Sequence, residues 1–253
     1  MEDKLTVKQK IQELEYEYPY HYIPVWKKGV FSQVQFWSWG MHYLAGIKIV
    51  LDQLDHFSFN SLVDIGCGDG RFLREVARRY PNVRLLGLDY SERAIRFAQV
   101  MNPKINYRVM NISEMLPLER FDVATMVEVL EHIPPCQIDR LLETVSNVID
   151  NNGRLIITVP HLNKPVQNKH YQHFSSKVLK GYLMKHFRQI SFIPFDANSK
   201  VMALFEQLIG GRGNNFIITK TQLTSWVFRL YINRFLYCKE ERKCLRIAAL
   251  CRK

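Results

Sequence analysis

The stretch "VDIGCGDGRFL", Val63–Leu73, decides the fold, because three glycines follow directly behind a short apolar run. The run "SLVDI" (61–65) is typical of a buried strand, and a helical pattern begins at residue 71. Gly66, Gly68 and Gly70 form the turn between them. A glycine turn at a helix start lets a ligand approach the backbone and favours an anionic group. Three ligand classes fit such a turn: a dinucleotide, a nucleoside triphosphate, or another molecule with an anionic end.

Strand and helix patterns alternate on both sides of this turn. Six further apolar runs indicate strands, at 83–88, 105–110, 121–127, 154–159, 190–195 and 244–251. Helical patterns are expected at 4–17, 33–55, 71–79, 91–101, 135–149, 175–186 and 221–237. Strands alternating with helices of this length form βαβ units around a parallel sheet. The sequence therefore predicts an α/β fold with a doubly wound sheet.

The spacing of the glycines reduces the number of ligand classes that fit the turn. A triphosphate-binding loop needs Gly-Lys-Ser/Thr at the helix start, but Arg71 and Phe72 follow Gly70. A dinucleotide fingerprint is G-x-G-x-x-G, whereas this turn is G-x-G-x-G, which alone discriminates weakly. Asp89 closes the second strand in "LLGLDYS", where a carboxylate accepts hydrogen bonds from the two hydroxyls of an adenosine ribose. The helix start can then meet the carboxylate of an amino acid rather than a diphosphate.

Together these elements resemble motif I and the second acidic motif of class I S-adenosylmethionine methyltransferases. The segments 107–117, 121–135 and 151–160 extend the resemblance over roughly residues 61–195, and a nicotinamide oxidoreductase is the competing interpretation. The resemblance implies a Rossmann-like sheet of seven strands, mostly parallel, with the last strand antiparallel. It places the methyltransferase domain at 58–253, with a helical insertion at about 198–240. Residues 1–57 would form an N-terminal helical segment, whose stretch "YEYPYHYIP" either covers the cofactor as a lid or plugs the sheet edge.

The resemblance also implies which residues bind S-adenosylmethionine. Asp89 would hold the ribose, the glycines the methionine end, and Glu128 the sulfonium side. Asn111 stands where the family usually has Asp, so its amide oxygen would have to accept the adenine hydrogen bond. The full expected cofactor-binding set is Asp64, Gly66, Cys67, Gly68, Gly70, Asp89, Tyr90, Asn111, Ile112 and Glu128.

The motif "EVLEHI" gathers acidic and imidazole groups where the fourth strand ends. In a parallel sheet this end carries the ligand site. Glu128, Glu131 and His132, with His170 from a later loop, could bind Mg²⁺ or Mn²⁺. Similar E-x-x-E-H cores with a later His occur in ubiquinone-pathway O-methyltransferases and in small-RNA 3′-terminal 2′-O-methyltransferases. Without a metal, four histidines are candidates for a general base: His132, His161, His170 and His173.

The expected reaction is methyl transfer to a small-molecule hydroxyl, such as that of a sugar or secondary metabolite. Seventeen of the 35 lysines and arginines, but four of the 24 acidic residues, follow Pro160. This basic portion favours an anionic acceptor and keeps open the alternative of an RNA 2′-hydroxyl. A cofactor-binding scaffold without catalysis is the non-enzyme alternative. No apolar stretch is long enough to span a membrane, and five scattered cysteines are typical of a reducing compartment, so a cytoplasmic location is expected.

Two later stretches have no assigned role in the predicted site. In "LTSWVFRLYINRFLYCKEERK" (223–243), Ser225, Arg229 and Asn233 form a polar stripe at helical spacing, and most other positions are apolar. This pattern is typical of a helix packed on the core, with a membrane or RNA surface as the alternative. The glycines of 209–215 do not follow a strand pattern and predict a flexible loop.

Overall fold

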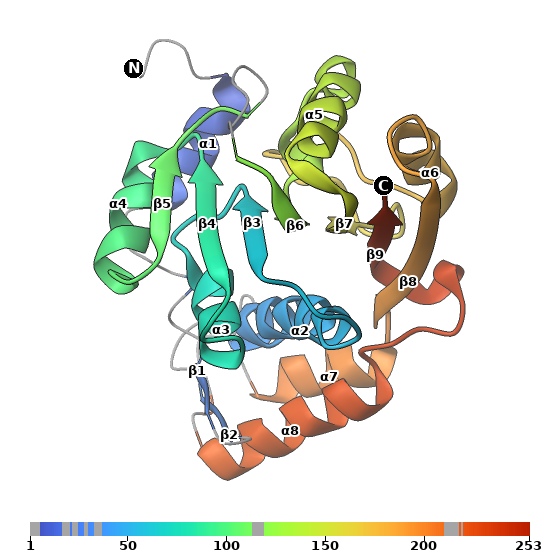
Figure 1. Cartoon of the computed structure of the whole chain (residues 1–253). Helices are drawn as coiled ribbons and strands as arrows, with labels where there is room; N and C mark the ends of the chain where they lie inside the picture. Colours follow the sequence, from blue (N-terminus) through green and yellow to red (C-terminus); the bar gives the residue numbers. More distant parts are fainter. Residues whose placement is uncertain are drawn as a thin grey trace.

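The computed structural model (Figure 1) describes residues 6–16, 21, 25–27, 30–32, 37–112, 119–209, 218 and 220–253. Its helices are α1 Val7–Glu15, α2 Trp37–Leu54, α3 Arg71–Arg79, α4 Glu92–Met101, α5 Pro135–Asn147, α6 Ser176–Leu183, α7 Lys200–Ile209 and α8 Thr221–Arg234. Its strands are β1 Val25–Lys27, β2 Val30–Ser32, β3 Ser61–Ile65, β4 Arg84–Asp89, β5 Asn106–Val109, β6 Phe121–Val127, β7 Ile149–Pro160, β8 Gln189–Ala197 and β9 Cys244–Arg252. Two short 3-10 turns, η3 Leu130–His132 and η4 Glu241–Lys243, complete these elements.

The main sheet confirms the predicted fold class. Its seven strands lie in the order β5-β4-β3-β6-β7-β9-β8, and β1 and β2 form a separate hairpin. Strands β3 to β7 pair in parallel, whereas β9 is antiparallel to both β7 and β8. The direction of chain progression reverses at β3, which lies between β4 and β6. Ligands of open α/β sheets bind at the carboxyl ends of the strands beside such a switch point, and the glycine turn lies there.

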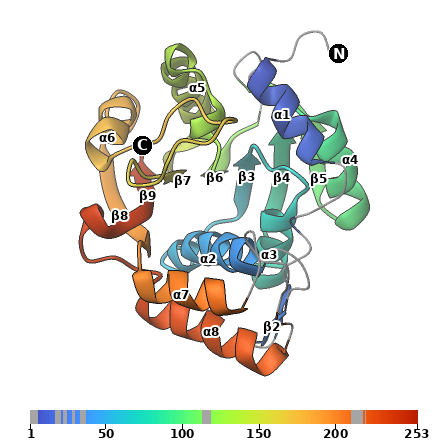
Figure 2. The ribbon, with the colours of Figure 1, turned by 180° about the vertical axis from the view of Figure 1, so that it is seen from behind.

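Burial explains why the central strand is a continuous apolar run. All five residues of β3 are buried, because helices cover both faces of the sheet. One core cluster joins α2 and α8 to one face, and a second joins α5 and α6 to the other. Figures 1 and 2 show α2, α7 and α8 gathered on one side of the molecule, with α1 and α5 on the opposite side.

The predicted element boundaries hold best near the glycine turn. Strand β3, strand β6 and helix α3 have the expected bounds. Helix α7 lies within the helical insertion expected at about 198–240, although its own bounds were not predicted, and α8 ends at Arg234 rather than at 237. Helix α8 packs on the core, as its pattern predicts. Of its polar stripe Ser225 is buried, and only Arg229 and Asn233 are exposed. From residue 210 on, the loop expected at 209–215 lies outside the described residues.

A polar network anchors α7 and α8 to the sheet. His42 of α2 places Nδ1 2.8 Å from Asp196 Oδ1 and Nε2 2.7 Å from Glu206 Oε1. Tyr231 donates its hydroxyl to Asp196 at 2.7 Å, and Arg246 donates Nε to the same carboxylate at 3.0 Å. Burial opposes protonation of His42, but Asp196 and Glu206 outweigh it and raise the His42 pKa to about 9. A charged imidazolium therefore joins α2, β8 and α7.

Candidate donor and acceptor site

The glycine turn is built from backbone that only glycine adopts without strain. Gly66, Gly68 and Gly70 have φ values of +73°, +54° and +78°, which lie in the left-handed region. A Cβ on Gly66 would stand 2.6 Å from the Val129 side chain, and one on Gly70 would stand 2.5 Å from the Tyr107 hydroxyl. Gly70 also caps α3, so the free amides of that helix start open toward the turn. The turn is a close-fitting cradle for an anionic group.

Asp89 ties the end of β4 to this cradle. Its carboxylate accepts hydrogen bonds from the amides of Gly68 at 2.8 Å and Ser91 at 2.9 Å. The side chain is buried, and burial raises its pKa to about 6 against the opposing effect of those two bonds. Asp89 thus lies beside the glycines, as the sequence predicts.

The other expected cofactor-binding residues surround the turn with different environments. Asp64 is buried inside β3, where it accepts a hydrogen bond from Thr125 at 2.7 Å, and burial raises its pKa to about 7. Cys67 and Ile112 are buried, whereas Tyr90 and Asn111 are half-buried. Asn111 and Ile112 directly precede 113–118, which lie outside the described residues. Asp64 therefore connects β3 to β6 just before the glycine turn, and Cys67 of that turn is buried.

The N-terminal segment covers this region. Tyr16 is buried, and its hydroxyl lies 2.6 Å from the position of a Cβ on Gly68. His21 places Nδ1 2.9 Å from the buried carboxylate of Asp69, and its ring stacks on Tyr43 at 4.8 Å between centroids. The sequence reasoning missed the pairing of His21 with Asp69, because no local spacing connects two residues so far apart in the chain.

Helix α1 reaches both sides of the same region. Lys8 donates Nζ to the carbonyl oxygens of Asn168 and His170, both at 2.7 Å. At the next turn of the helix, Tyr90 donates its hydroxyl to Gln12 at 3.2 Å. One helix therefore connects the loop after β4 with the loop after β7.

Glu128 ends β6 in an unusual conformation. Its φ is +57°, although it carries a side chain, and its amide donates to the Thr158 carbonyl at 3.0 Å. Strained backbone of this kind is frequent at functional sites. The Oε1 atom of Glu128 is buried and has no hydrogen-bond partner among the described residues. An acidic oxygen of Glu128 is therefore available to a ligand group at the carboxyl ends of the strands.

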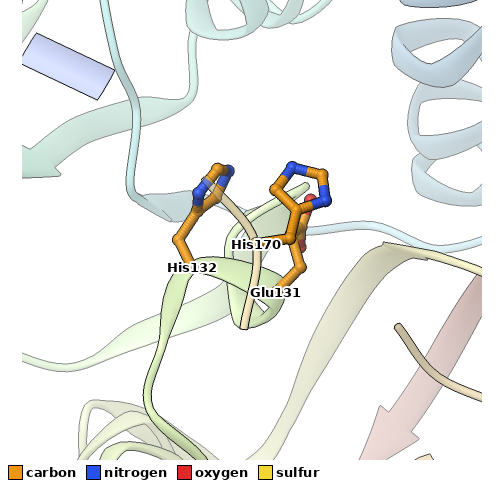
Figure 3. A group of neighbouring side chains, drawn as sticks. All are labelled: Glu131, His132 and His170. Atoms are coloured by element: carbon orange, nitrogen blue, oxygen red, sulfur yellow. The ribbon is translucent and has the colours of Figure 1, made fainter. Parts of the chain in front are cut away.

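Three side chains of the predicted metal set come together. The ligand atoms of Glu131, His132 and His170 all lie within 4.8 Å of one another. Figure 3 shows Glu131 and His132 projecting from one turn, with the Glu131 carboxylate beside the His170 ring. Glu131 Oε2 is buried without a hydrogen-bond partner among the described residues. Glu128 is not one of these three residues, but its carboxylate lies near enough to act electrostatically on Glu131, so its place as a metal ligand stays a prediction.

Hydrogen bonds define which imidazole nitrogens are available. His173 Nδ1 lies 2.8 Å from the Lys164 carbonyl, so it must carry the proton and leave Nε2 as an acceptor. His170 Nδ1 lies 2.8 Å from that Nε2 and donates to it, which leaves His170 Nε2 bare. His132 Nδ1 lies 3.3 Å from the Lys169 carbonyl, which leaves its Nε2 bare in the same way. Two imidazoles thus present unprotonated nitrogens, and His173 orients one of them.

The charge states agree with this assignment. Burial lowers the pKa of His132 to about 4 and that of His170 to about 2, with neighbouring imidazoles and lysines adding to the shift. Burial, followed by the nearby Glu128 carboxylate, raises the pKa of Glu131 well above its usual range. At neutral pH the cluster therefore holds neutral imidazoles, which are the form that binds metals or accepts protons.

Comparison with known proteins fits this architecture. A family profile described as a methyltransferase domain matches residues 62–153, the span from β3 into β7. Residues 62–153 match this family, and the seven-stranded sheet has the class I S-adenosylmethionine methyltransferase fold.

Relatives in sequence cover only part of this chain. The ubiquinone biosynthesis O-methyltransferase of Rickettsia akari is 30% identical over 119 residues, which are 46% of this chain and 47% of that protein. The ubiquinone biosynthesis O-methyltransferase of Bradyrhizobium diazoefficiens is 28% identical over 106 residues, 40% of each chain. The chain thus matches less than half the length of these curated relatives.

Similarity in structure extends further and concerns the fold. A methyltransferase of Thermotoga maritima, described as a possible histamine N-methyltransferase, superposes with a TM-score of 0.61 at 15% identity and covers 97% of both chains. The class I domain therefore accounts for the main sheet and its flanking helices. Within the described residues, no helix is long and apolar enough to cross a membrane.

Proposed function

We propose that this methyltransferase transfers the methyl group of S-adenosylmethionine to a hydroxyl of a small-molecule acceptor. The observation that carries the proposal is the cluster of Glu131, His132 and His170 beside the strand end that bears Glu128. The curated relatives, named as O-methyltransferases of ubiquinone biosynthesis, support a small hydroxyl acceptor. The neighbouring Lys164 and Lys169, which act electrostatically on the cluster, favour an anionic one.

The described residues fit the donor. Gly66, Gly68 and Gly70 form a turn of positive φ at the start of α3, and Asp89 accepts a hydrogen bond from the Gly68 amide beside it. When bound, the donor supplies an electrophilic methyl group on a sulfonium. In the proposed arrangement Asp89 holds the ribose hydroxyls, the glycine turn holds the methionine end, and Glu128 faces the sulfonium side. Asn111 and Ile112 border the adenine. Holding donor and acceptor in line in a dry site is the main catalytic contribution.

The acceptor hydroxyl must lose its proton as it is methylated. His132 and His170 belong to one cluster and each has a bare ring nitrogen, so we propose that either can take that proton. The same two nitrogens and the buried Glu131 oxygen also suit Mg²⁺ or Mn²⁺, with water or the acceptor completing the coordination. Such a cation would orient and acidify the hydroxyl. We propose the metal-assisted form, since Glu131 Oε2 is a buried oxygen that has no hydrogen-bond partner in the part of the chain that the structure describes.

The N-terminal segment is proposed to act as a lid. Tyr16 and His21 lie over the glycine turn, and α1 spans the loops on both sides. A lid of this kind excludes water and holds the acceptor in position.

Donor binding tests the first part of the proposal. Titration calorimetry with S-adenosylhomocysteine should show saturable binding that Asp89→Ala weakens by roughly 1.5–3 kcal/mol. Asp122→Ala is the matched control, because Asp122 also accepts two backbone amides, those of Asn60 and Ser61, at the other end of the sheet. Equal losses in both variants would refute the assignment of the ribose to Asp89.

Transfer itself is tested with radiolabelled donor and a panel of small hydroxyl compounds and RNA. Label in a small molecule supports the proposal, label in RNA supports the 2′-hydroxyl alternative, and no transfer with intact donor binding supports the scaffold alternative.

Chelation by EDTA should abolish turnover, and Mn²⁺ or Mg²⁺ should restore it. His170→Ala should weaken metal affinity, whereas His186→Ala, whose imidazole bonds Asp139, should not. Full activity after chelation would refute the proposal that a metal ion assists the reaction.

A further inference from the structure

Helices α7 and α8 expose a set of large apolar side chains that the methyltransferase core does not use. We define the apolar ridge as Val201, Leu204, Leu208, Ile218 and Trp226, whose exposed fractions lie between 36% and 58%. Such a group of exposed apolar residues on one surface marks an interaction site.

The ridge is continuous across both helices. Val201, Leu204 and Leu208 share one face of α7, because they recur at three- and four-residue spacing. Phe205 of α7 packs edge-on against Trp226 of α8, with ring centroids 5.6 Å apart. Ile218 donates its amide to the Ile209 carbonyl at 2.7 Å, so it lies beside the end of α7.

The opposite faces of these helices are already used by the core. Met202 and Ile209 of α7 are buried, as are Phe228 and Tyr231 of α8. Helix α7 therefore has apolar residues both toward the protein and away from it. A helix that only packs on a core has a polar outer face, so the outer face of α7 is fitted to a second apolar environment.

Cations flank the ridge, and no opposing carboxylate is exposed beside them in the described part of α7 and α8. Lys200 precedes Val201, Lys220 begins α8, and Arg229 lies one turn beyond Trp226; all three are exposed. The acidic residue of these two helices, Glu206, is directed inward to His42, and its side chain is 11% exposed. The surface thus combines apolar side chains with positive charge.

We propose that the apolar ridge binds peripherally to an anionic membrane surface. Valine and leucines on one face of α7, a tryptophan on the adjoining α8, and bordering lysine and arginine are the residue types of helices that lie in the membrane interface. The flanking cations would approach lipid phosphates, each contributing favourably to binding. The same cations disfavour pairing of two copies through this face, since like charges would oppose each other. Nucleic-acid bases stack on aromatic side chains, and Trp226 is the one aromatic member of the ridge, whose other four members are aliphatic.

Vesicle flotation of the full chain tests the proposal. The protein should float with vesicles of phosphatidylcholine mixed with phosphatidylglycerol, remain in solution with phosphatidylcholine alone, and dissociate as salt is raised. Leu204→Glu combined with Leu208→Glu should abolish flotation. Lys200→Gln and Arg229→Gln should each weaken partitioning about fivefold. Val100→Glu is the matched control, because Val100 is 78% exposed on α4, away from the ridge.

Each variant should retain its circular dichroism spectrum and urea midpoint, so loss of flotation cannot reflect unfolding, and neither measurement depends on the proposed catalysis. The proposal is overturned by absence of flotation with anionic vesicles, or by flotation that ignores lipid charge and the ridge variants. A ridge-dependent dimer in sedimentation, or ridge-dependent RNA retention without lipid binding, would assign the surface to a second copy or to RNA instead.

Discussion

Replacing Gly68 by alanine probes both the glycine turn and the segment that covers it. The backbone of Gly68 has a φ of +54°, which costs an L-residue about 1–2 kcal/mol. The added Cβ would also stand 2.6 Å from the Tyr16 hydroxyl oxygen, too close to be accommodated without movement of that ring. Tyr16 is 4% exposed, so its displacement gives up at most roughly 1.5–3 kcal/mol of apolar burial.

The two contributions separate in a double-mutant cycle. Gly68→Ala alone should lower the free energy of unfolding by about 2–4 kcal/mol. In a Tyr16→Phe background the offending oxygen is absent, and the next atom from another residue, His21 Cε1, lies at 3.6 Å, an ordinary contact distance. The cost should then fall to the backbone strain of about 1–2 kcal/mol.

Urea unfolding followed by circular dichroism measures both values. Gly181→Ala is the control, because Gly181 lies in α6 with no atom within 4 Å of its Cβ position, and the change should stabilise by about 0.5–1 kcal/mol. An equal cost of Gly68→Ala in both backgrounds would show that Tyr16 does not cover the turn. A cost as small as that of the control would refute the left-handed backbone itself.

Two further predictions concern stability away from the turn. Because the His42 pKa is raised from 6.5 to about 9, the stability from its charged form is complete below pH 6.5 and is lost as pH rises through about 9. Urea unfolding across this interval should show the loss, and His42→Asn should remove it. Leu54→Ala, at a fully buried site, should cost about 2–5 kcal/mol in the same assay, whereas Val100→Ala should change stability by less than about 0.5 kcal/mol.

The sequence predicted the elements whose signals agree with one another. Strand β3 and helix α3 have the expected bounds because an apolar run, three glycines and a helical pattern meet between Ser61 and Arg79. The bounds of α7, within the expected helical insertion, could not be predicted, for a physical reason. Its apolar residues face both inward, as Met202, and outward, as Leu204, so no polar face reveals the helical period.

The sequence predicted which residue types gather at the site, but not their backbone conformations or long-range contacts. The spacing of E-x-x-E-H placed Glu131 and His132 together correctly, and His170 joined them as expected. The same spacing could not show that Glu128 adopts a positive φ. Nor could any local pattern bring His42 to Asp196, 154 residues later, since that contact depends on how α2 packs against the end of β8.

The position of β9 has a consequence for synthesis on the ribosome. Strand β8 pairs with β9 alone in the main sheet, and β9 lies between it and β7. Until Cys244–Arg252 has been translated, β8 therefore has no strand to join, and the outer edge of β7 stays open. At 5–20 residues per second, the delay after Ala197 is roughly 3–11 seconds. During that interval the nascent chain presents two unpaired strand edges, which makes it a substrate for chaperones that bind extended apolar segments.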